Sequence, residues 1–254
     1  MENTKPLISP DLRAAAAKYP YFISEARKRI IFILCVFGIS TFAGFIFYET
    51  IIKFVIDILL LQGVNIVFTS PFQFINLAIS CGFTSGVVFS FPFIVAQILS
   101  FLRPALRGRE YKAILWFLPF SLFLFLVGFL FGFLIMKWQI QIFLARSISL
   151  GIGNILDISR LLSVVILTSA FMGLGFQFPI VLLLLMRFGV IKHEKLSKAR
   201  LWIYLGSFIF SILLPPDSIL ADILLALPLV ILFEVTLILN RIFERRKVSA
   251  HMGL

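Results

Sequence analysis

The chain has 254 residues, of which 61% are hydrophobic and only 14% charged, and its mean hydropathy is +1.07. Soluble domains are about 45–50% apolar and about 25% charged, so these values exclude a soluble globular protein. The formal net charge is +11, but the basic residues lie in short clusters between apolar stretches. That pattern is typical of membrane orientation and excludes a nucleic-acid-binding class. Cys35 and Cys81 lie in apolar stretches, and no Cys/His cluster predicts a metal site or redox pair.

Residues 1–29 are predicted to form a cytoplasmic interfacial helix. Pro10 and Asp11 suit a helix start, and the alanine run at 14–17 favours its continuation. The basic and aromatic residues that follow suit a helix lying on the inner leaflet. Positive charges continue to Arg29, and the next apolar run lacks a small-x-small exit, so we expect no cleaved signal peptide.

Six apolar stretches predict an all-α integral membrane protein with six transmembrane helices, because a span needs about 20 apolar residues. The stretches are residues 30–48, part of 72–102, 113–136, 161–186, 201–214 and about 223–239. The predicted organisation is therefore a membrane domain at 30–240 followed by a basic cytoplasmic tail at 241–254.

The last two spans are expected to be short. Residues 201–214 would form a helix of about 21 Å, less than a hydrocarbon core of about 30 Å. Pro215 and Pro216 end this helix, and Asp217 and Asp222 place the following turn in a polar setting on the periplasmic side. Either the bilayer thins here or water reaches the turn. The alternative is a re-entrant hairpin, which would move the C-terminal tail to the other side.

Lysine and arginine residues predict the orientation. The N-terminal tail carries six, the loop between spans two and three carries four, the loop between spans four and five carries five, and the C-terminal tail carries four. The opposite side carries only Lys53, Lys137, Arg146 and Arg160. Cytoplasmic loops carry the excess of such residues, so both termini are predicted to be cytoplasmic, or on the corresponding side of an organelle.

Prolines occur inside four of the six spans, at positions 92, 119, 179 and 228. Each frees a carbonyl and favours a bend, so the helices are expected to be kinked and to form a curved wall. Prolines tolerated in the membrane without a functional meaning are the alternative.

Two acidic residues stand among cations at the ends of spans. Glu110 is the only acid in the basic loop 103–112, and Glu25 precedes the cations at 27–29. Carboxylates held there can pair with incoming cations. From residue chemistry alone, an ordinary intramolecular surface ion pair, which contributes about 0–1 kcal/mol, is the favoured interpretation.

Two polar side chains are expected within the membrane. Gln177, in span four, either faces a hollow or makes an interhelical hydrogen bond at a packing seam. Glu234, in span six, either packs against a cation of the same chain or contacts a partner helix. Sequence alone leaves both choices open.

Five stretches, in order along residues 22–246, resemble motifs of the TatC family, the multi-spanning subunit of the twin-arginine protein translocase. They are Phe22-Ile23-Ser24-Glu25-Ala26-Arg27-Lys28-Arg29 (family H-L-x-E-L-R-x-R), Thr69-Ser70-Pro71, Phe101-Leu102-Arg103-Pro104-Ala105-Leu106 with Arg109-Glu110 (F-x-x-P-x-L-x-x-x-E), Gly175-Phe176-Gln177-Phe178-Pro179, and Leu214-Pro215-Pro216-Asp217 before Leu225-Ala226-Leu227-Pro228 and Glu234. The chain departs from the family at Phe22, Ala26, Ala221 and Gln177, where His, Leu, Gln and often Glu are usual.

The resemblance implies a core and receptor subunit that exports folded proteins by the proton-motive force, without nucleotide, cofactor or enzymatic activity. It implies that Glu25, Arg27, Phe101 and Glu110 bind twin-arginine signal peptides. Expected partners are single-span TatA/TatB-type subunits, the lipid bilayer and further copies of the chain, with no nucleic acid. The expected location is the inner (plasma) membrane, or a thylakoid or other organelle inner membrane.

A small-molecule secondary transporter is the alternative function. Gly86-x-x-Phe89-x-Phe91-Pro92 and Gly173-x-x-Phe176-x-Phe178-Pro179 could mark a parallel repeat. Such a transporter needs ionisable groups around a midplane site, and only Glu234 and the neutral Gln177 are available.

Overall fold

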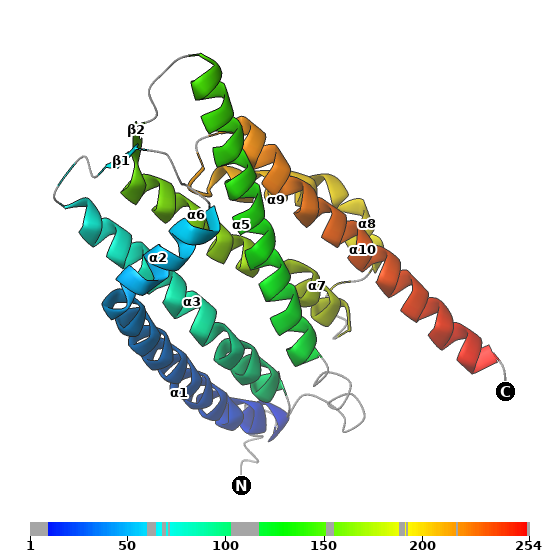
Figure 1. The fold of residues 1–254 in the computed structure, drawn as a ribbon. Helices are drawn as coiled ribbons and strands as arrows, with labels where there is room; N and C mark the ends of the chain where they lie inside the picture. The colour runs from blue at the N-terminus through cyan, green and yellow to red at the C-terminus, as the bar shows by residue number, and fades with distance from the viewer. Residues whose placement is uncertain are drawn as a thin grey trace, which may run out of the picture.

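The structure is a computed structural model, and it describes residues 10–59, 65–67, 70, 72–102, 117–150, 155–187, 191, 193–216 and 218–252. Its helices are α1 (Pro10–Ile46), α2 (Tyr48–Leu59), α3 (Gln73–Leu102), α5 (Phe117–Ser149), α6 (Ile158–Gly175), α7 (Phe178–Arg187), α8 (His193–Lys198), α9 (Arg200–Ile212) and α10 (Ile219–Met252) (Figure 1). Two three-residue strands, β1 (Asn65–Val67) and β2 (Ile155–Asp157), pair in parallel.

Five helical segments are long and apolar enough to cross a membrane, which confirms the all-α membrane fold. They are Ile23–Ile46, Gln73–Phe101, Phe117–Ser149, Ile158–Met186 and Ile219–Arg241. The remaining predicted span is α9, a shorter apolar helix of 13 residues, as expected from its sequence. The final span is longer than expected, since its apolar segment has 23 residues and continues at both ends of the predicted 223–239.

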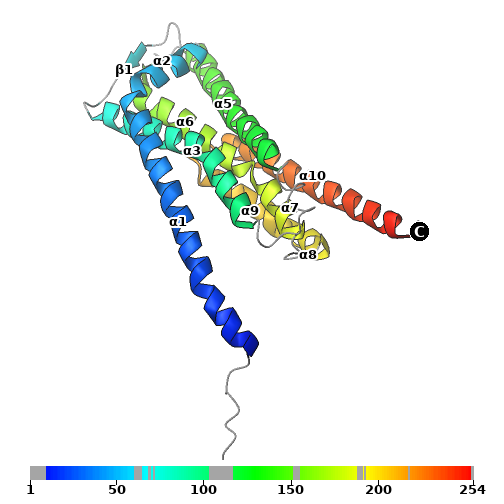
Figure 2. The same cartoon turned by 90° about the horizontal axis from the view of Figure 1, so that it is seen from below.

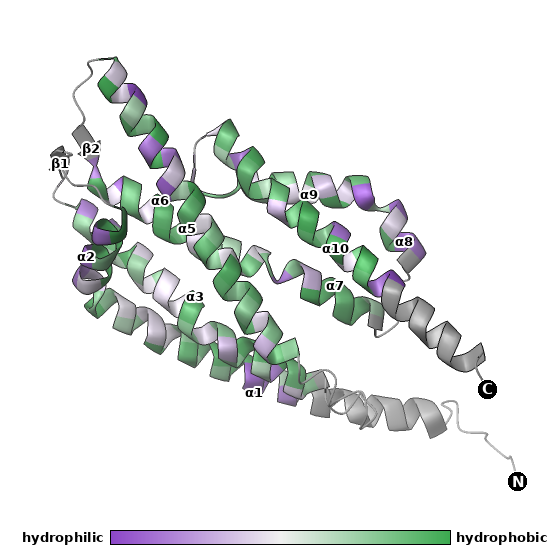
Figure 3. Ribbon diagram, turned by 45° about the vertical axis from the view of Figure 1, so that its right-hand side comes forward, coloured by the Kyte–Doolittle hydropathy of each residue, from purple (hydrophilic) through white to green (hydrophobic). Residues whose placement is uncertain are grey.

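The helices form a row in which neighbours pack along their length. The helix α1 packs on α3, α3 on α6, and α6 on α5, while α10 packs against α5, α7 and α9. Figures 1 and 2 show α1 and α10 at opposite sides of this arrangement. Apolar residues run along most of α3, α5 and α10, and hydrophilic ones gather near helix ends and on α2 and α8 (Figure 3). Large apolar side chains such as Phe42, Trp202 and Leu213 are exposed, as a lipid-facing surface requires.

Small residues allow α1 and α3 to approach closely. A Cβ built on Gly44 would overlap the Ser85 side chain, and one built on Gly82 would lie 2.9 Å from the Thr41 carbonyl oxygen. Membrane helices associate through such small-residue contacts, because lipid tails remove the hydrophobic driving force between helices. The seam between α1 and α3 therefore depends on glycine.

The start of α1, the end of α3, the end of α7 and the end of α10 lie at one end of the molecule (Figure 1). We call this the terminal end, and the end that carries β1 and β2 the strand end. A chain that crosses the membrane an even number of times begins and ends on the same side, as α1 and α10 do here. That the terminal end faces the cytoplasm stays a prediction.

The predicted boundary between an interfacial helix and the first span is not a break in the structure. The helix α1 is continuous from Pro10 to Ile46, and the Glu25 and Arg29 side chains form an i,i+4 ion pair just before the boundary. No Gly or Pro stands between residues 21 and 29 to end the helix. The structure thus has one continuous helix over the expected interfacial segment and the first span, and the interfacial position of the segment before residue 30 stays a prediction.

Two elements at the strand end were not predicted. The helix α2 is amphipathic, burying Val55 and Leu59, and it was hidden in a stretch too short and too charged for a span. The helix α5 runs to Ser149, well past the predicted end at residue 136, because no Gly or Pro interrupts it. On this extension the Lys137 ammonium donates to the Ile58 carbonyl oxygen at 2.8 Å, which satisfies an orphan acceptor at the end of α2.

Of the four prolines in the predicted spans, Pro179 lies where the fourth span is interrupted between α6 and α7. The helix α6 ends at Gly175 and α7 begins at Phe178, where Pro179 has no N–H to donate to the Gly175 carbonyl. Pro92 and Pro228 lie inside α3 and α10, which continue through them, and Pro119 lies in the first turn of α5. The predicted curved wall stays a prediction.

Candidate functional site

A guanidinium group is enclosed between α1 and α3 at the terminal end. The Arg29 Nη2 atom donates to Glu25 Oε1 at 2.6 Å. The Nη1 atom donates to Gln97 Oε1 at 3.1 Å and to the Gln97 carbonyl oxygen at 3.2 Å. The Arg29 Cζ atom lies 5.9 Å from the centroid of the Phe101 ring, within cation–π range. We call Glu25, Arg29, Gln97 and Phe101 the Arg29 cluster.

Helix periodicity explains why these four residues meet. Glu25 and Arg29 are four residues apart on α1, and Gln97 and Phe101 are four residues apart on α3, so each pair lies on one helix face. The two helices pack together, which brings the faces into contact. The result is a carboxylate, an amide and an aromatic ring around a single cation.

The cluster is partly open to solvent and incompletely satisfied. The exposed fractions of the Arg29 and Glu25 side chains are 21% and 27%. The Arg29 Nε atom is buried and has no hydrogen-bond partner among the described residues. A buried donor without an acceptor costs about 1–3 kcal/mol, so this arrangement holds Arg29 less firmly than a full set of five hydrogen bonds would.

Of the other residues predicted to bind the signal peptide, the structure describes Arg27 and Phe101 but not Glu110. Arg27 is exposed on α1, and Phe101 is 38% exposed one residue before the end of α3. Glu110 lies in the segment 103–116, outside the described residues. The helix α3 itself ends at Leu102, the residue after Phe101 of the Arg29 cluster.

Gln177 joins two helices at the interruption between α6 and α7. Its Oε1 accepts from the Ser121 hydroxyl at 2.6 Å, and its Nε2 donates to the carbonyl oxygens of Ser121 at 3.2 Å and Gly173 at 3.4 Å. It also lines a cavity of about 740 Å³ between α6, α7 and α9. Both sequence readings hold in part, since the same side chain makes an interhelical hydrogen bond and borders a hollow.

Glu234 ties α10 to α9 near the terminal end. The Tyr204 hydroxyl donates to Glu234 Oε1, and Arg200 Nε lies 3.6 Å from the same oxygen. Both partners belong to α9. The intramolecular packing that the sequence left open is therefore present, and a contact with a partner helix stays a prediction.

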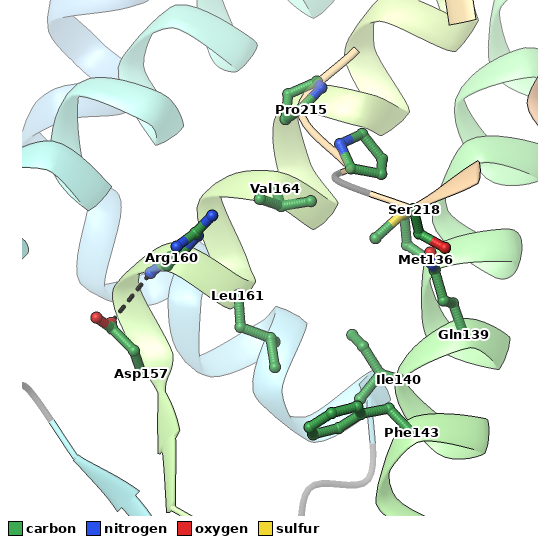
Figure 4. A pocket seen from close by; sticks show the side chains of 11 residues that line it. Met136, Gln139, Ile140, Phe143, Asp157, Arg160, Leu161, Val164, Pro215 and Ser218 are labelled. Atoms are coloured by element: carbon green, nitrogen blue, oxygen red, sulfur yellow. Dashed lines mark hydrogen bonds between the residues drawn. The ribbon is translucent and has the colours of Figure 1, made fainter. Parts of the chain in front are cut away.

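The predicted double-proline turn borders a second cavity, of about 340 Å³, at the strand end (Figure 4). Pro215, Pro216 and Ser218 face it from one side, Gln139 and Phe143 come from α5, and the start of α6 closes it. The side chain of Asp157, the last residue of β2, accepts from the Arg160 backbone N–H at 3.2 Å and caps the start of α6. Asp217 lies outside the described residues.

Sequence reasoning missed Arg29 and Gln97 as members of the site. Arg29 was one of several cations in a basic cluster, and its i,i+4 spacing from Glu25 was the available signal. Gln97 stands alone in an apolar run, and its spacing of four from Phe101 placed both on one helix face. Over the residues that the structure describes, no group of His, Cys, Asp and Glu side chains could hold a metal ion.

Comparisons with known proteins agree with this architecture. The family profile described as "Sec-independent protein translocase protein (TatC)" matches residues 21–228. TatCy of Bacillus subtilis (strain 168) is 28% identical over 231 residues, covering 88% of this chain and 89% of the relative. TatC of Escherichia coli (strain K12) is 26% identical over 248 residues, covering 96% and 91%.

Two solved structures have the same fold. The crystal structure of "Twin Arginine Translocase Receptor- TatC in DDM" superposes with a TM-score of 0.76 at 26% identity, covering 86% of this chain and 98% of that one. A second structure of a twin-arginine translocase receptor, TatC, gives a TM-score of 0.70 at 27% identity, covering 87% and 98%. With most of the chain matched by the family profile, this multi-pass inner-membrane protein belongs to the TatC family of Sec-independent protein translocase subunits.

Proposed function

We propose that the chain is the receptor subunit of a twin-arginine translocase, and that it binds the two adjacent arginines of a signal peptide at the terminal end. The observation that carries the proposal is Glu25, a partly exposed carboxylate that already pairs with a guanidinium, that of Arg29, which lies over the Phe101 ring. The family match and the description of the related crystal structures as receptors support it.

The chemistry of the peptide suits this end of the molecule. A guanidinium group stays charged, forms two parallel hydrogen bonds with a carboxylate and stacks on aromatic rings. Two adjacent guanidiniums call for two carboxylates, and we assign these to Glu25 and Glu110. Phe101 supplies a ring face, and Arg27, exposed next to Glu25, is placed with them by its family motif.

We further propose that the subunit works without enzymatic activity or a cofactor, using the proton-motive force, together with single-span TatA/TatB-type proteins and further copies of itself. The hollow bordered by Gln177 is a suitable place for a partner helix, because it lies between spans and is lined mostly by apolar side chains. Glu234, only partly buried and close to Arg200, is a second candidate contact for such a helix.

The test is binding of a fluorescent twin-arginine signal peptide to the full-length protein in detergent. We expect the twin-arginine peptide to bind more tightly than a twin-lysine peptide, because lysine keeps the positive charge but cannot form two parallel hydrogen bonds with a carboxylate. Glu25→Gln and Glu110→Gln should each raise Kd about tenfold or more, because each removes a charge-assisted contact of about 1.5–3 kcal/mol.

Glu194→Gln is the matched control, since Glu194 is an exposed acid on α8 and lies outside the proposed site. It should leave Kd within about twofold, as expected for a surface charge. Equal affinities for the twin-arginine and twin-lysine peptides would reject the proposal. The alternative of a small-molecule transporter is not favoured, because the family match and both structural relatives are protein translocase subunits.

A further inference from the structure

The Arg29 cluster surrounds one guanidinium with contacts from two helices. Around Arg29 it provides a carboxylate oxygen of Glu25 at 2.6 Å, two oxygens of Gln97 at 3.1 and 3.2 Å, and the face of Phe101 at 5.9 Å. An i,i+4 ion pair alone would be an ordinary feature of one helix. Here the remaining contacts come from a second helix, so the cation is enclosed and not merely paired.

We infer that Arg29 is an internal occupant of this guanidinium site, and that one arginine of the signal peptide displaces it on binding. The inference rests on the proposed function, and it adds Gln97 to the residues that would contact the signal peptide. In the exchange one guanidinium leaves as another enters, so the charge of the site does not change.

Two features make the exchange feasible. Arg29 is held incompletely, because its Nε is buried without an acceptor among the described residues. The Arg29 and Glu25 side chains are also 21% and 27% exposed, so Glu25 is reachable from solvent and Arg29 has a way out. A long flexible side chain such as that of Arg29 can rotate toward water without any movement of the helix.

The exchange has a consequence for affinity. A site that is vacant for only a fraction of the time binds its ligand with an apparent affinity reduced by that fraction. Arg29 therefore weakens signal-peptide binding and keeps it reversible. Removing the Arg29 guanidinium should tighten binding, which is opposite to the effect of removing a residue that only supports the fold.

The first experiment compares peptide affinities for Arg29→Gln and a matched control, Lys28→Gln. Lys28 is an exposed neighbour on α1, so its removal lowers the local positive charge equally. We expect Arg29→Gln to lower Kd for the twin-arginine peptide by about three- to tenfold, with a smaller change for the twin-lysine peptide. Lys28→Gln should change both peptides equally and slightly. An Arg29→Gln protein that binds the twin-arginine peptide no better than Lys28→Gln does would overturn the inference.

The second experiment measures peptide binding to the wild-type protein, and a variant serves only to assign one resonance. The Nε–H resonance of Arg29 is assigned by its loss in Arg29→Lys and followed by NMR in micelles. Saturation with the twin-arginine peptide should move it to the value of a solvated arginine, and the twin-lysine peptide should leave it in place. A resonance unmoved at saturation would overturn displacement while leaving the receptor proposal intact. Failure of the wild type to prefer twin-arginine over twin-lysine would instead reject the receptor proposal itself.

Discussion

Gln177 shows how a polar side chain is accommodated between apolar helices. It makes three hydrogen bonds, and its main partner, Ser121, is only 2% exposed, so the Ser121 hydroxyl has no water as a substitute for Gln177. A sequence can reveal that such a residue lies within a span. It cannot name the partner, because Ser121 is 56 positions away and becomes a neighbour only when α5 packs beside α6.

Gln177→Leu should destabilise the protein by about 0.6–2 kcal/mol, the range measured for interhelical hydrogen bonds in membranes. The loss arises because the Ser121 hydroxyl keeps its buried position without its acceptor. The measurement is thermal unfolding in detergent, with Ser121→Ala and the double variant completing the cycle. If the two single effects simply add, Gln177 and Ser121 are not coupled and the hydrogen bond contributes nothing.

At the scale of single elements, the sequence predicts helices that cross the bilayer better than helices that do not. Long apolar runs revealed α1, α3, α5, the α6–α7 pair and α10, since nothing but a span needs so many consecutive apolar residues. It missed α2, which is short and carries charged residues, and the far end of α5, which continues past the predicted apolar run. Of the site, it found Glu25 and Phe101 but neither Arg29 nor Gln97, whose roles arise from the meeting of α1 and α3.

The seam between α1 and α3 provides a matched pair of substitutions on one helix. Gly44→Ala should destabilise the protein by about 1–3 kcal/mol, because the new methyl group would overlap Ser85 and force the helices apart. Gly38→Ala meets nothing within 4 Å and should be neutral or stabilising by up to about 1 kcal/mol, from helix propensity. Thermal unfolding of the two variants checks this. Equal effects would mean that close approach at Gly44 does not matter.

At the scale of the whole molecule, the row of helices and its charges define two ends. The start of α1 and the ends of α3, α7 and α10 share the terminal end, and the structure thereby groups the segments that carry most of the basic residues. The positive-inside rule assigns the end with more basic residues to the cytoplasmic side of the bilayer. This orientation is tested by labelling the protein in its membrane.

Single cysteines placed at each end provide that test, in a background where Cys35 and Cys81 are replaced by serine and alanine. A membrane-impermeant maleimide added to intact cells should label cysteine at position 146, which is exposed at the strand end, and leave position 194 unlabelled. Inverted vesicles should reverse the pattern. Labelling of position 194 in intact cells would contradict the predicted cytoplasmic terminal end.

The order in which the helices pair has a consequence for biogenesis. Three of the helix pairs join segments that are near in the chain, namely α1 with α3, α5 with α6 and α9 with α10. Each hairpin-like unit can therefore assemble soon after the ribosome releases it, before later segments exist. Other contacts, such as those of α3 with α6 and of α10 with α5 and α7, must wait for more distant sequence. Stepwise insertion of such local units lowers the time that unpaired helices spend exposed to aggregation or proteolysis.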